Sequence, residues 1–441
     1  MTNTKIYDII ILGGGIAGIY TTYQLLKKDP TLSILLLEAT DRFGGRIYTT
    51  PKYHLEAGAG RFSNNHPLLL ELIQELGLEN KVIKISSSNE YFPIHLEKNQ
   101  SKKDDGIKKV IQASKREKKS YLQTISFIDY ANQILSKEEV KYILDSFGYY
   151  SELVIMNAHD AIQLMHNLDP NNQFYVLKDG LSQIIDEMIK KIQTMKPNVN
   201  VQILKRNHKV ISVKREKQTQ IQIPIYSLET ENKKIFYTKK IITALPKQVI
   251  EKITFFKSLK PDLKKIECAP LCRIYSIFKD KDKGWIKDLP KFTTNNNLRM
   301  VIPIDATKGT IMISYTDNKY ADYWQKLYKK EGIDKVDEKI AENMKQSINI
   351  TIPKPEKTMI YYWSCGVGYW GIGADSHEIS QKMIKPFEKE EVYICGEHYS
   401  ERNQQWMEGA LETSISVLTH FLIQNAHGVS KSAPIAHLIC S

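Results

Sequence analysis

The chain has 441 residues, of which 42% are hydrophobic and 25% are charged, a balance typical of globular proteins and not of disordered or fibrous ones. This length exceeds what one hydrophobic core usually serves, so we expect two or three lobes. No apolar run reaches the ~18 residues of a membrane span, and the first residues lack the basic start of a signal peptide. We therefore expect a soluble, intracellular (cytoplasmic) protein without a membrane partner.

Charge and cysteine content narrow the class further. The formal net charge is +12, with a local excess of lysine in residues 98–120. That segment lacks interleaved aromatic residues, which argues against a nucleic-acid partner and favours a solvated basic surface. The cysteines are odd in number and scattered, which favours a reduced setting over a disulfide framework. They are Cys268, Cys272, Cys365, Cys395 and Cys440. No metal site is expected.

The N-terminal segment has the pattern of a dinucleotide-binding unit. An apolar strand (Ile9–Leu12) runs into a glycine cluster, a helix is predicted over Ile16–Leu26, and a second buried strand ends in an acid. The glycines permit a tight turn, close approach to a pyrophosphate and close helix–strand packing, while the acid binds ribose hydroxyls. The residues of this fingerprint are Gly13, Gly15, Gly18 and Glu38.

Two further segments favour FAD over NAD. The stretch ATDRFGGRIYT after Glu38 places two arginines around a glycine pair, suited to a second clamp on phosphate that a nicotinamide enzyme does not need. These residues are Arg42, Gly44, Gly45 and Arg46. Far downstream, residues 392–414 predict a strand, then Gly396 and Glu397, and a helix beginning near Met407. A helix N-terminus there suits the electron-rich pyrimidine end of a flavin, and Glu397 is expected to hold hydroxyls of the cofactor chain.

These motifs together resemble those of the flavin-dependent amine oxidase superfamily. The residues are E-A-x-D-R-x-G-G-R, C-G-E-H and W-M-E-G-A, and the pattern is most similar to L-amino-acid oxidases and tryptophan monooxygenase-like enzymes. The resemblance implies bound FAD, held non-covalently because Gly368 occupies the position where some monoamine oxidases carry a flavin-bonded cysteine. Further cofactor contacts implied by it are Ile16, Ala17, Ala39, Gly58, Ala59, Gly60, Arg61, Val210 (at the adenine), Trp406 and Met407.

The resemblance also implies an α/β (α+β) fold. A Rossmann-like FAD-binding domain is expected from separated segments, 1–60, 198–262 and 390–424. A mixed-sheet substrate-binding domain is expected from 61–100, 166–197 and 263–389, with a helical subdomain at 101–165. Within that subdomain Ser136–Glu139 reads as a capping box. Residues 425–441 contain no periodic pattern and are expected to form a loose tail.

Two residues are expected to bind the substrate. Arg61, in EAGAGRF, resembles the arginine that grips the substrate carboxylate in amino-acid oxidases, and its planar fork suits a carboxylate and repels a protonated polyamine. The alternative is a surface or FAD-phosphate arginine. Tyr315, after an apolar strand, would give the same carboxylate a second hydrogen bond, although a tyrosine at a strand end is more often packing.

Four residues are candidates for the catalytic site. Trp406 and Tyr369 resemble the two aromatic walls beside the flavin. His159 matches a histidine proposed to take the amine proton, against the alternative of a structural histidine. Arg273 stands where the superfamily usually has a lysine below the flavin, and because an arginine does not release its proton, reaction with oxygen is the least secure step. A slip of register by a residue or two is the alternative.

The leading hypothesis is an FAD-dependent oxidoreductase that oxidises the C–N bond of an L-amino acid, giving the imino acid, then 2-oxo acid, ammonia and hydrogen peroxide. A monooxygenase outcome uses the same pocket. Alternatives are a monoamine or polyamine oxidase, or a flavin-binding protein with weak or lost turnover. The expected partners are a small amine or amino acid and molecular oxygen or another electron acceptor, and a homodimer is left open.

Overall fold

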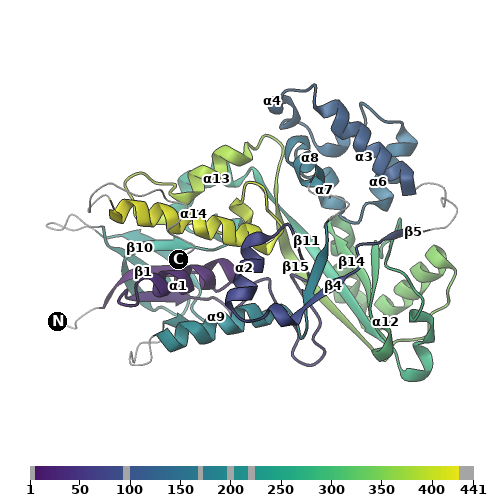
Figure 1. The fold of residues 1–441 in the computed structure, drawn as a ribbon, viewed down its shortest axis with the longest axis horizontal. Coiled ribbons are helices and arrows are strands. Elements are labelled where there is room, and N and C mark those ends of the chain that lie inside the picture. Colours follow the sequence, from purple (N-terminus) through teal and green to yellow (C-terminus); the bar gives the residue numbers. More distant parts are fainter. Residues whose placement is uncertain (1–4, 93–99, 167–171, 196–202, 217–223, 427–441) are drawn as a thin grey trace.

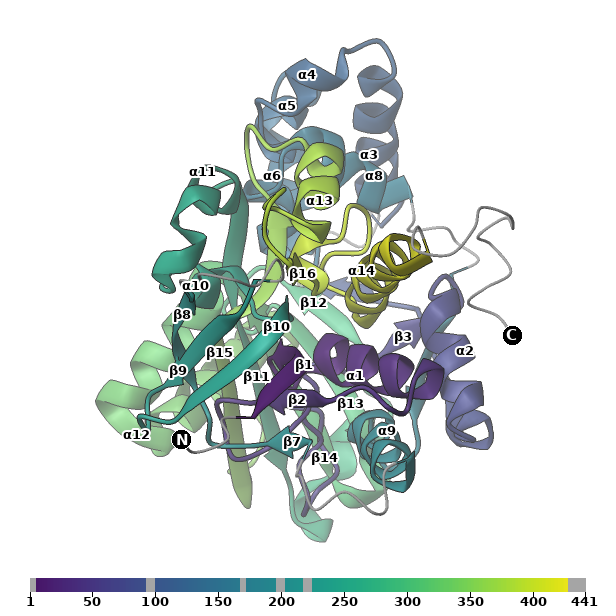
Figure 2. The same ribbon diagram turned by 90° about the vertical axis from the view of Figure 1, so that its left-hand side faces the viewer.

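A computed structural model describes residues 5–92, 100–166, 172–195, 203–216 and 224–426 (Figures 1 and 2). The predicted loose tail at 425–441 lies, beyond Ala426, outside the described residues.

A seven-stranded sheet forms the cofactor half of the molecule. Its order is β7-β2-β1-β10-β9-β8, with β16 paired to β10. The strands are β1 (Ile6–Leu12), β2 (Ile34–Leu37), β7 (Leu204–Lys205), β8 (Val210–Arg215), β9 (Tyr226–Thr230), β10 (Ile235–Thr243) and β16 (Val392–Ile394). The central pairs β1–β2, β1–β10 and β10–β16 are parallel, which explains why these strands are apolar runs buried on both faces. All seven strands fall within the three segments predicted for the FAD-binding domain.

Helices cover both faces of this sheet. On one face lie α1 (Ile16–Lys28), α9 (Ser182–Met195) and α14 (Met407–Ala426), which share a core with α2 (Pro67–Glu75) (Figure 2). On the other face the core includes α10 (Lys247–Ile250), α11 (Lys260–Leu263) and α13 (Ser376–Ile384). The packing of α2 and α9 differs from the prediction, which placed both in the substrate-binding domain. Each buries its apolar face against the cofactor half.

A six-stranded sheet forms the other half, in the order β15-β11-β14-β13-β12-β5. Its strands are β5 (Glu90–Phe92), β11 (Ile266–Ile277), β12 (Phe292–Thr294), β13 (Met300–Asp305), β14 (Thr310–Asp317) and β15 (Lys357–Trp370). Helix α12 (Asn318–Ile348) packs on it and is interrupted at Gly332, where φ is 81° (Figure 1). A small three-stranded sheet has the order β3-β6-β4. Its strands are β3 (Phe62–Ser63), β4 (Val82–Ile85) and β6 (Phe174–Leu177).

The predicted helical subdomain is a cluster of helices with its own core, at the upper right of Figure 1. It contains α3 (Gln100–Ser114), α4 (Lys119–Leu122), α5 (Phe127–Ala131), α6 (Lys137–Ser146), α7 (Tyr150–Val154) and α8 (Ala158–His166). Helix α6 begins with the predicted capping box, in which Ser136 and Glu139 satisfy each other's backbone N–H groups. This core also includes Ala269 and Tyr369 from the six-stranded sheet, so the subdomain is anchored to the substrate-side strands.

The α/β fold class is therefore as expected, with a Rossmann-like sheet assembled from separated segments, a second mixed sheet and a helical subdomain. Within the described ranges no helix combines the length and apolar character needed to cross a lipid bilayer.

Candidate active site

A cavity of about 1100 Å³ is lined by both sheets and by the helical subdomain. One end is formed by the glycine turns after β1 and β2, the other by β11, β14 and the start of α7. Most of the predicted site residues line it. They are Gly13, Gly15, Ile16, Ala17, Glu38, Ala39, Arg42, Gly44, Gly45, Arg46, Gly58, Ala59, Gly60, Arg61, Arg273, Tyr315, Tyr369, Gly396, Glu397, Trp406 and Met407.

The first glycine turn has the geometry of a pyrophosphate cradle. Gly13 has φ +101°, and a Cβ on Gly18 would lie 2.0 Å from the Gly13 carbonyl oxygen, so both positions need glycine. Gly15 has an allowed φ of −74°, and its nearest neighbour, the Cα of Gly45, would lie 3.9 Å from an added Cβ. No side chain caps the N-terminus of α1 at Gly15. The uncapped N–H groups at this positive helix end fit the pyrophosphate of a dinucleotide.

Glu38 is fixed by its own strand end. One carboxylate oxygen accepts the Gly14 N–H at 2.7 Å, and the other accepts the Thr40 N–H and hydroxyl, both at 2.8 Å. Its orientation toward the cavity is therefore set before any ligand binds, as a ribose-binding acid requires. Val210, predicted at the adenine, is buried in β8 and is not among the cavity-lining residues.

Arg42 supports the second glycine turn. Its guanidinium donates to the carbonyls of Gly45 at 2.6 Å and Ile47 at 3.2 Å, and it lies 4.4 Å from the centre of the Tyr48 ring. Gly44 and Gly45 have positive φ values of 109° and 58° in this turn. Arg42, which the sequence predicts to clamp phosphate, therefore also holds the glycine turn in its conformation. The sequence did not indicate this structural role.

Arg46 and Glu397, from opposite ends of the sequence, form an ion pair whose carboxylate is buried. Their side chains are 2.7 Å apart, and Glu397 also accepts the N–H groups of Gly368 at 2.9 Å and Gln405 at 2.8 Å. Burial raises the pKa of Glu397, but Arg46, His398 and the two backbone donors outweigh it and lower the pKa to about 2. Arg46 also donates to the Gly366 carbonyl at 3.0 Å, which fixes β15 against the cofactor end.

Arg61 lies at the substrate end within an aromatic enclosure. It donates to the Tyr149 hydroxyl at 2.7 Å, and its guanidinium carbon lies 4.2 Å from the centre of the Phe174 ring. Trp406 stacks on the same Phe174, with ring centres 6.2 Å apart and an interplanar angle of 16°. Tyr369 is 2% exposed and lines the cavity separately.

A second guanidinium, that of Arg273, lies in the same cavity. It is 6% exposed, donates to the Glu56 carbonyl at 2.9 Å and lies 4.6 Å from the centre of the Tyr315 ring. A Cβ on Gly60 would lie 2.6 Å from its Nη1, so glycine is needed there to admit the arginine. The Tyr315 ring also meets the edge of Tyr149 at 5.8 Å. The predicted substrate residues Arg61 and Tyr315 are thus linked through Tyr149.

Sequence reasoning missed four acids that line this cavity, Glu56, Glu152, Asp179 and Asp317. Glu152, on α7, is 7% exposed, and burial together with the neighbouring Asp317 raises its pKa to about 8. Asp317, at the end of β14, accepts the backbone N–H groups of Tyr150 at 3.1 Å and Ser151 at 2.7 Å. No sequence motif marks Glu152 or Asp317, because they meet only where the helical subdomain packs on the six-stranded sheet.

His159 lies elsewhere. It is on α8, its ring nitrogen lies 3.1 Å from Gln163, and it is not among the cavity-lining residues. Burial, followed by the charge of Lys119, lowers its pKa. The buried face of α8 carries Ala158, Ala161 and Ile162, so His159 points away from the cavity side chains, and the base role predicted for it is not supported by its position.

The cysteine expectation is wrong for one pair. Cys268 on β11 and Cys365 on β15 form a disulfide, 97 residues apart in sequence. Antiparallel pairing of these strands brings them together, with Cys268 opposite Gly368 and a register shift nearby, which sequence spacing does not indicate. Cys272 and Cys395 are free and buried, and Cys440 lies outside the described residues.

Comparison with known proteins identifies the family of this chain. Residues 16–417 match the family described as flavin containing amine oxidoreductase. The chain is 22% identical to Aplysianin-A of Aplysia kurodai over 94% of this chain and 90% of that one. It is 34% identical to a Dictyostelium discoideum protein described as a probable flavin-containing monoamine oxidase A, over 18% of this chain and 17% of that one.

Solved structures share the fold. A double mutant of putrescine oxidase has a TM-score of 0.75 at 16% identity, covering 95% of this chain and all (100%) of that chain. Putrescine oxidase bound to putrescine has a TM-score of 0.72 at 14% identity, covering 95% of this chain and 100% of that one. The predicted superfamily and flavin cofactor are confirmed at the level of the family. With its dinucleotide fingerprint, paired glycine turns and family-wide match, this chain belongs to the flavin containing amine oxidoreductase family and is an FAD-dependent oxidoreductase.

Proposed function

We propose that the protein oxidises the C–N bond of an L-amino acid, using non-covalently bound FAD. The observation that carries this proposal is the pair of guanidiniums, Arg61 and Arg273, in one cavity with Tyr149 and Tyr315. An arginine fork that keeps N–H groups on a cavity binds a carboxylate through two parallel hydrogen bonds. Arg61 is partly exposed, and among the described residues its side chain donates to one side chain, that of Tyr149, so it can still take up a ligand.

The charge balance of the cavity supports a substrate carboxylate. Glu152 has a pKa of about 8 and is therefore mostly neutral at pH 7. Asp317, another acid of this cavity, already accepts two backbone N–H groups. Glu56, a further lining acid, accepts the Leu181 N–H at 2.6 Å and the Thr49 hydroxyl at 3.1 Å. The guanidinium of Arg61 is a permanent cation beside these satisfied acids, and it attracts a carboxylate and repels a diamine.

The chain's own residues supply orientation and a dry environment. When bound, FAD supplies the acceptor for the hydride leaving the α-carbon. Arg61 holds the far end of the substrate, while Trp406 lines the cavity beside Arg61 and helps to exclude water. The amine must be neutral to lose hydride readily. Glu152 lies in the same cavity, and its carboxylate form, which is populated near pH 8, is suited to accept the amine proton.

Product analysis tests the reaction. Under air, one equivalent of L-amino acid should give one 2-oxo acid, one ammonia and one hydrogen peroxide. The D-enantiomer should give none, because a fixed carboxylate and a fixed amine leave only one face of the α-carbon toward the cofactor. Carbon dioxide and an amide in place of the 2-oxo acid would assign the monooxygenase outcome. Absence of all products from every L-amino acid would overturn the proposal.

A diamine is the second candidate substrate. Glu152 and Asp317 are acids in the same cavity, and putrescine oxidase shares the fold. Above pH 8, where Glu152 ionises, the cavity gains a further negative charge and a cationic substrate becomes more favourable. Turnover of putrescine that exceeds that of every amino acid and rises with the ionisation of Glu152 would favour this candidate.

A further inference from the structure

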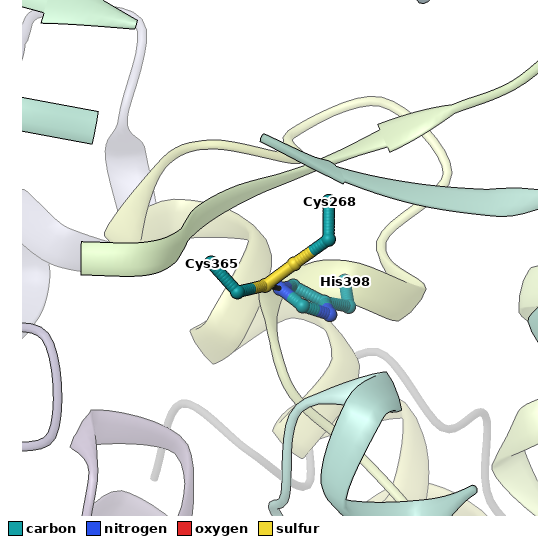
Figure 3. Close-up of side chains that lie close together, drawn as sticks. All are labelled: Cys268, Cys365 and His398. Atoms are coloured by element: carbon teal, nitrogen blue, oxygen red, sulfur yellow. Dashed lines mark hydrogen bonds between the residues drawn. A yellow bond between two sulfur atoms is a disulfide. The ribbon is translucent and has the colours of Figure 1, made fainter. Parts of the chain in front are cut away.

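Cys268, Cys365 and His398 form a cluster in the wall of the cofactor cavity, shown in Figure 3. Cys365 and His398 line the cavity, and Gln248, which lies 3.8 Å from the Cys268 sulfur, lines it too. Both cysteines are partly exposed. His398 is 1% exposed, and its Nε2 lies 3.7 Å from the Cys365 sulfur. The disulfide therefore borders the cavity through Cys365 and has an imidazole beside it.

The protonation of His398 decides between two roles for this cluster. Its Nδ1 accepts the Lys247 backbone N–H at 3.2 Å, and a backbone N–H is always a donor. The ring is neutral because burial, with Arg46 and Lys247 nearby, lowers its pKa to about 4. The proton of the neutral ring therefore sits on Nε2, toward Cys365 and toward the Glu397 carboxylate at 3.5 Å. The nearby Arg46 Nη1 donates to the Gly366 carbonyl at 3.0 Å.

A protonated Nε2 is a poor metal ligand and a good partner for a thiolate. Two cysteines and a histidine are a common zinc-binding set, but that use needs the Nε2 lone pair. An N–H directed at sulfur instead stabilises the anion formed when a disulfide opens, and the Arg46 cation, 3.4 Å from Nε2, adds to this effect. The chemistry of the neighbours thus matches a disulfide that opens and closes.

We propose that Cys268–Cys365 is a redox-active disulfide that exchanges electrons with the flavin. The reduced flavin, formed by substrate oxidation, is the reductant. The S–S bond breaks and accepts two electrons and two protons, each cysteine becomes a thiol, and the flavin returns to its oxidised form. Cys365 is the sulfur that receives electrons, because it lines the cavity while Cys268 lies behind it. The pair gives the protein a store for two electrons in addition to the two held by the reduced flavin.

This inference rests on the proposed function only for its natural source of electrons, so the test bypasses the substrate. The purified protein, with its FAD, is reduced anaerobically by light with a deazaflavin photosensitiser. The number of electrons taken up is compared with the loss of the oxidised flavin band. We expect about four electrons per flavin, two for the flavin and two for the disulfide. A maleimide added afterwards should label Cys268 and Cys365 by peptide mass, with neither labelled before reduction.

Two variants provide the comparison. Cys365→Ser should take up only about two electrons, the flavin's own share. Cys272→Ala, on the same strand as Cys268 but fully buried and free, should behave like the wild type. Wild-type uptake of about two electrons without new labelling would overturn the proposal, as would labelling of both thiols before reduction or one tightly bound zinc per chain. The wild-type result stands even if the serine variant fails to fold.

Discussion

Arg273 and Tyr315 face each other on paired strands, with the guanidinium carbon 4.6 Å from the centre of the tyrosine ring. The same guanidinium donates to the Glu56 carbonyl at 2.9 Å and is accommodated by Gly60. A backbone carbonyl, a tyrosine ring and the space left by a glycine therefore hold the Arg273 guanidinium in place. Its permanent charge faces the cavity, yet it cannot release a proton as a lysine can.

Arg273→Lys should raise the rate at which oxygen reoxidises the reduced flavin, by about tenfold or more, which corresponds to 1.4 kcal/mol of barrier. An ammonium is smaller, leaves room for a water and exchanges protons. Stopped-flow mixing of photoreduced enzyme with oxygen measures the rate without using a substrate. An unchanged or slower rate would show that this position does not control the reaction with oxygen. The variant should also lose about 1–2 kcal/mol of folding stability, since the fork's contacts are lost.

Arg61→Met should weaken binding of amino acids roughly 10- to 150-fold, the effect of losing a charge-assisted hydrogen bond worth about 1.5–3 kcal/mol. Binding of amines without a carboxylate should change little. The dissociation constant comes from the dependence of anaerobic flavin reduction on substrate concentration. Arg116→Met, at an exposed position, is the matched control. Equal losses for amines and amino acids would contradict a carboxylate role.

Gly15→Ala should separate folding from cofactor binding. Gly15 has a φ of −74° and its added Cβ would meet nothing closer than 3.9 Å, so the fold should accept alanine with less than about 1 kcal/mol of change. The methyl group would nonetheless project toward the pyrophosphate cradle, and FAD affinity should fall at least about tenfold. Flavin retained through gel filtration, with thermal melting of the flavin-free form, measures both. Gly284→Ala, which meets nothing within 4 Å, should change neither.

Glu397→Gln should lower the folding stability by about 1–3 kcal/mol, because the partly exposed Arg46 loses its charged partner. The pKa of Glu397 in the folded protein is about 2, below its ordinary value of 4.5, so the stability it contributes is complete above pH 4.5 and is lost as the pH falls toward 2. As the pH falls, the flavin should therefore gain less fluorescence in the variant than in the wild type. Glu338→Gln, which breaks an exposed pair with Lys335, should leave the profile unchanged.

Glu152→Gln should flatten the pH dependence of stability on the alkaline side of pH 4.5. Glu152 keeps its proton in the folded state up to pH about 8, whereas in the unfolded chain it ionises near 4.5. The folded state binds the extra proton between these values, so stability falls as the pH rises from 4.5 to 8, by an amount of the order of a few kcal/mol. Melting temperatures from pH 5 to 9 test this, with the exposed Glu117→Gln as control. Parallel profiles for wild type and Glu152→Gln would contradict it.

The cofactor half could be predicted from sequence because its signals are local. The glycines, the following helix and the ribose acid lie within one short βαβ unit, and each residue has a backbone reason to be where it is. The capping box at Ser136 is local in the same way. The parallel strands were identifiable as continuous apolar runs, since both of their faces are buried.

The substrate half was harder because its contacts join distant segments. Tyr149, Glu152 and Asp317 meet only through packing of the helical subdomain on β14. The direction of His159 depends on which face of α8 is buried, and the disulfide depends on strand register. A single sequence specifies none of these pairings directly. The assignment of helices to domains depends on packing in the same way, since α2 and α9, predicted in the substrate-binding domain, share the core of the cofactor half.

The central claim is that the cavity accepts amino acids and not simple amines. Its most direct test is an anaerobic one, in which purified flavoprotein is mixed with pooled L-amino acids and, separately, with mono- and diamines, while the oxidised flavin band is followed. The account predicts bleaching by the amino acids alone, and loss of that bleaching at low substrate concentration in Arg61→Met. Bleaching by amines alone, or no bleaching by either pool in protein that light still reduces, would contradict it.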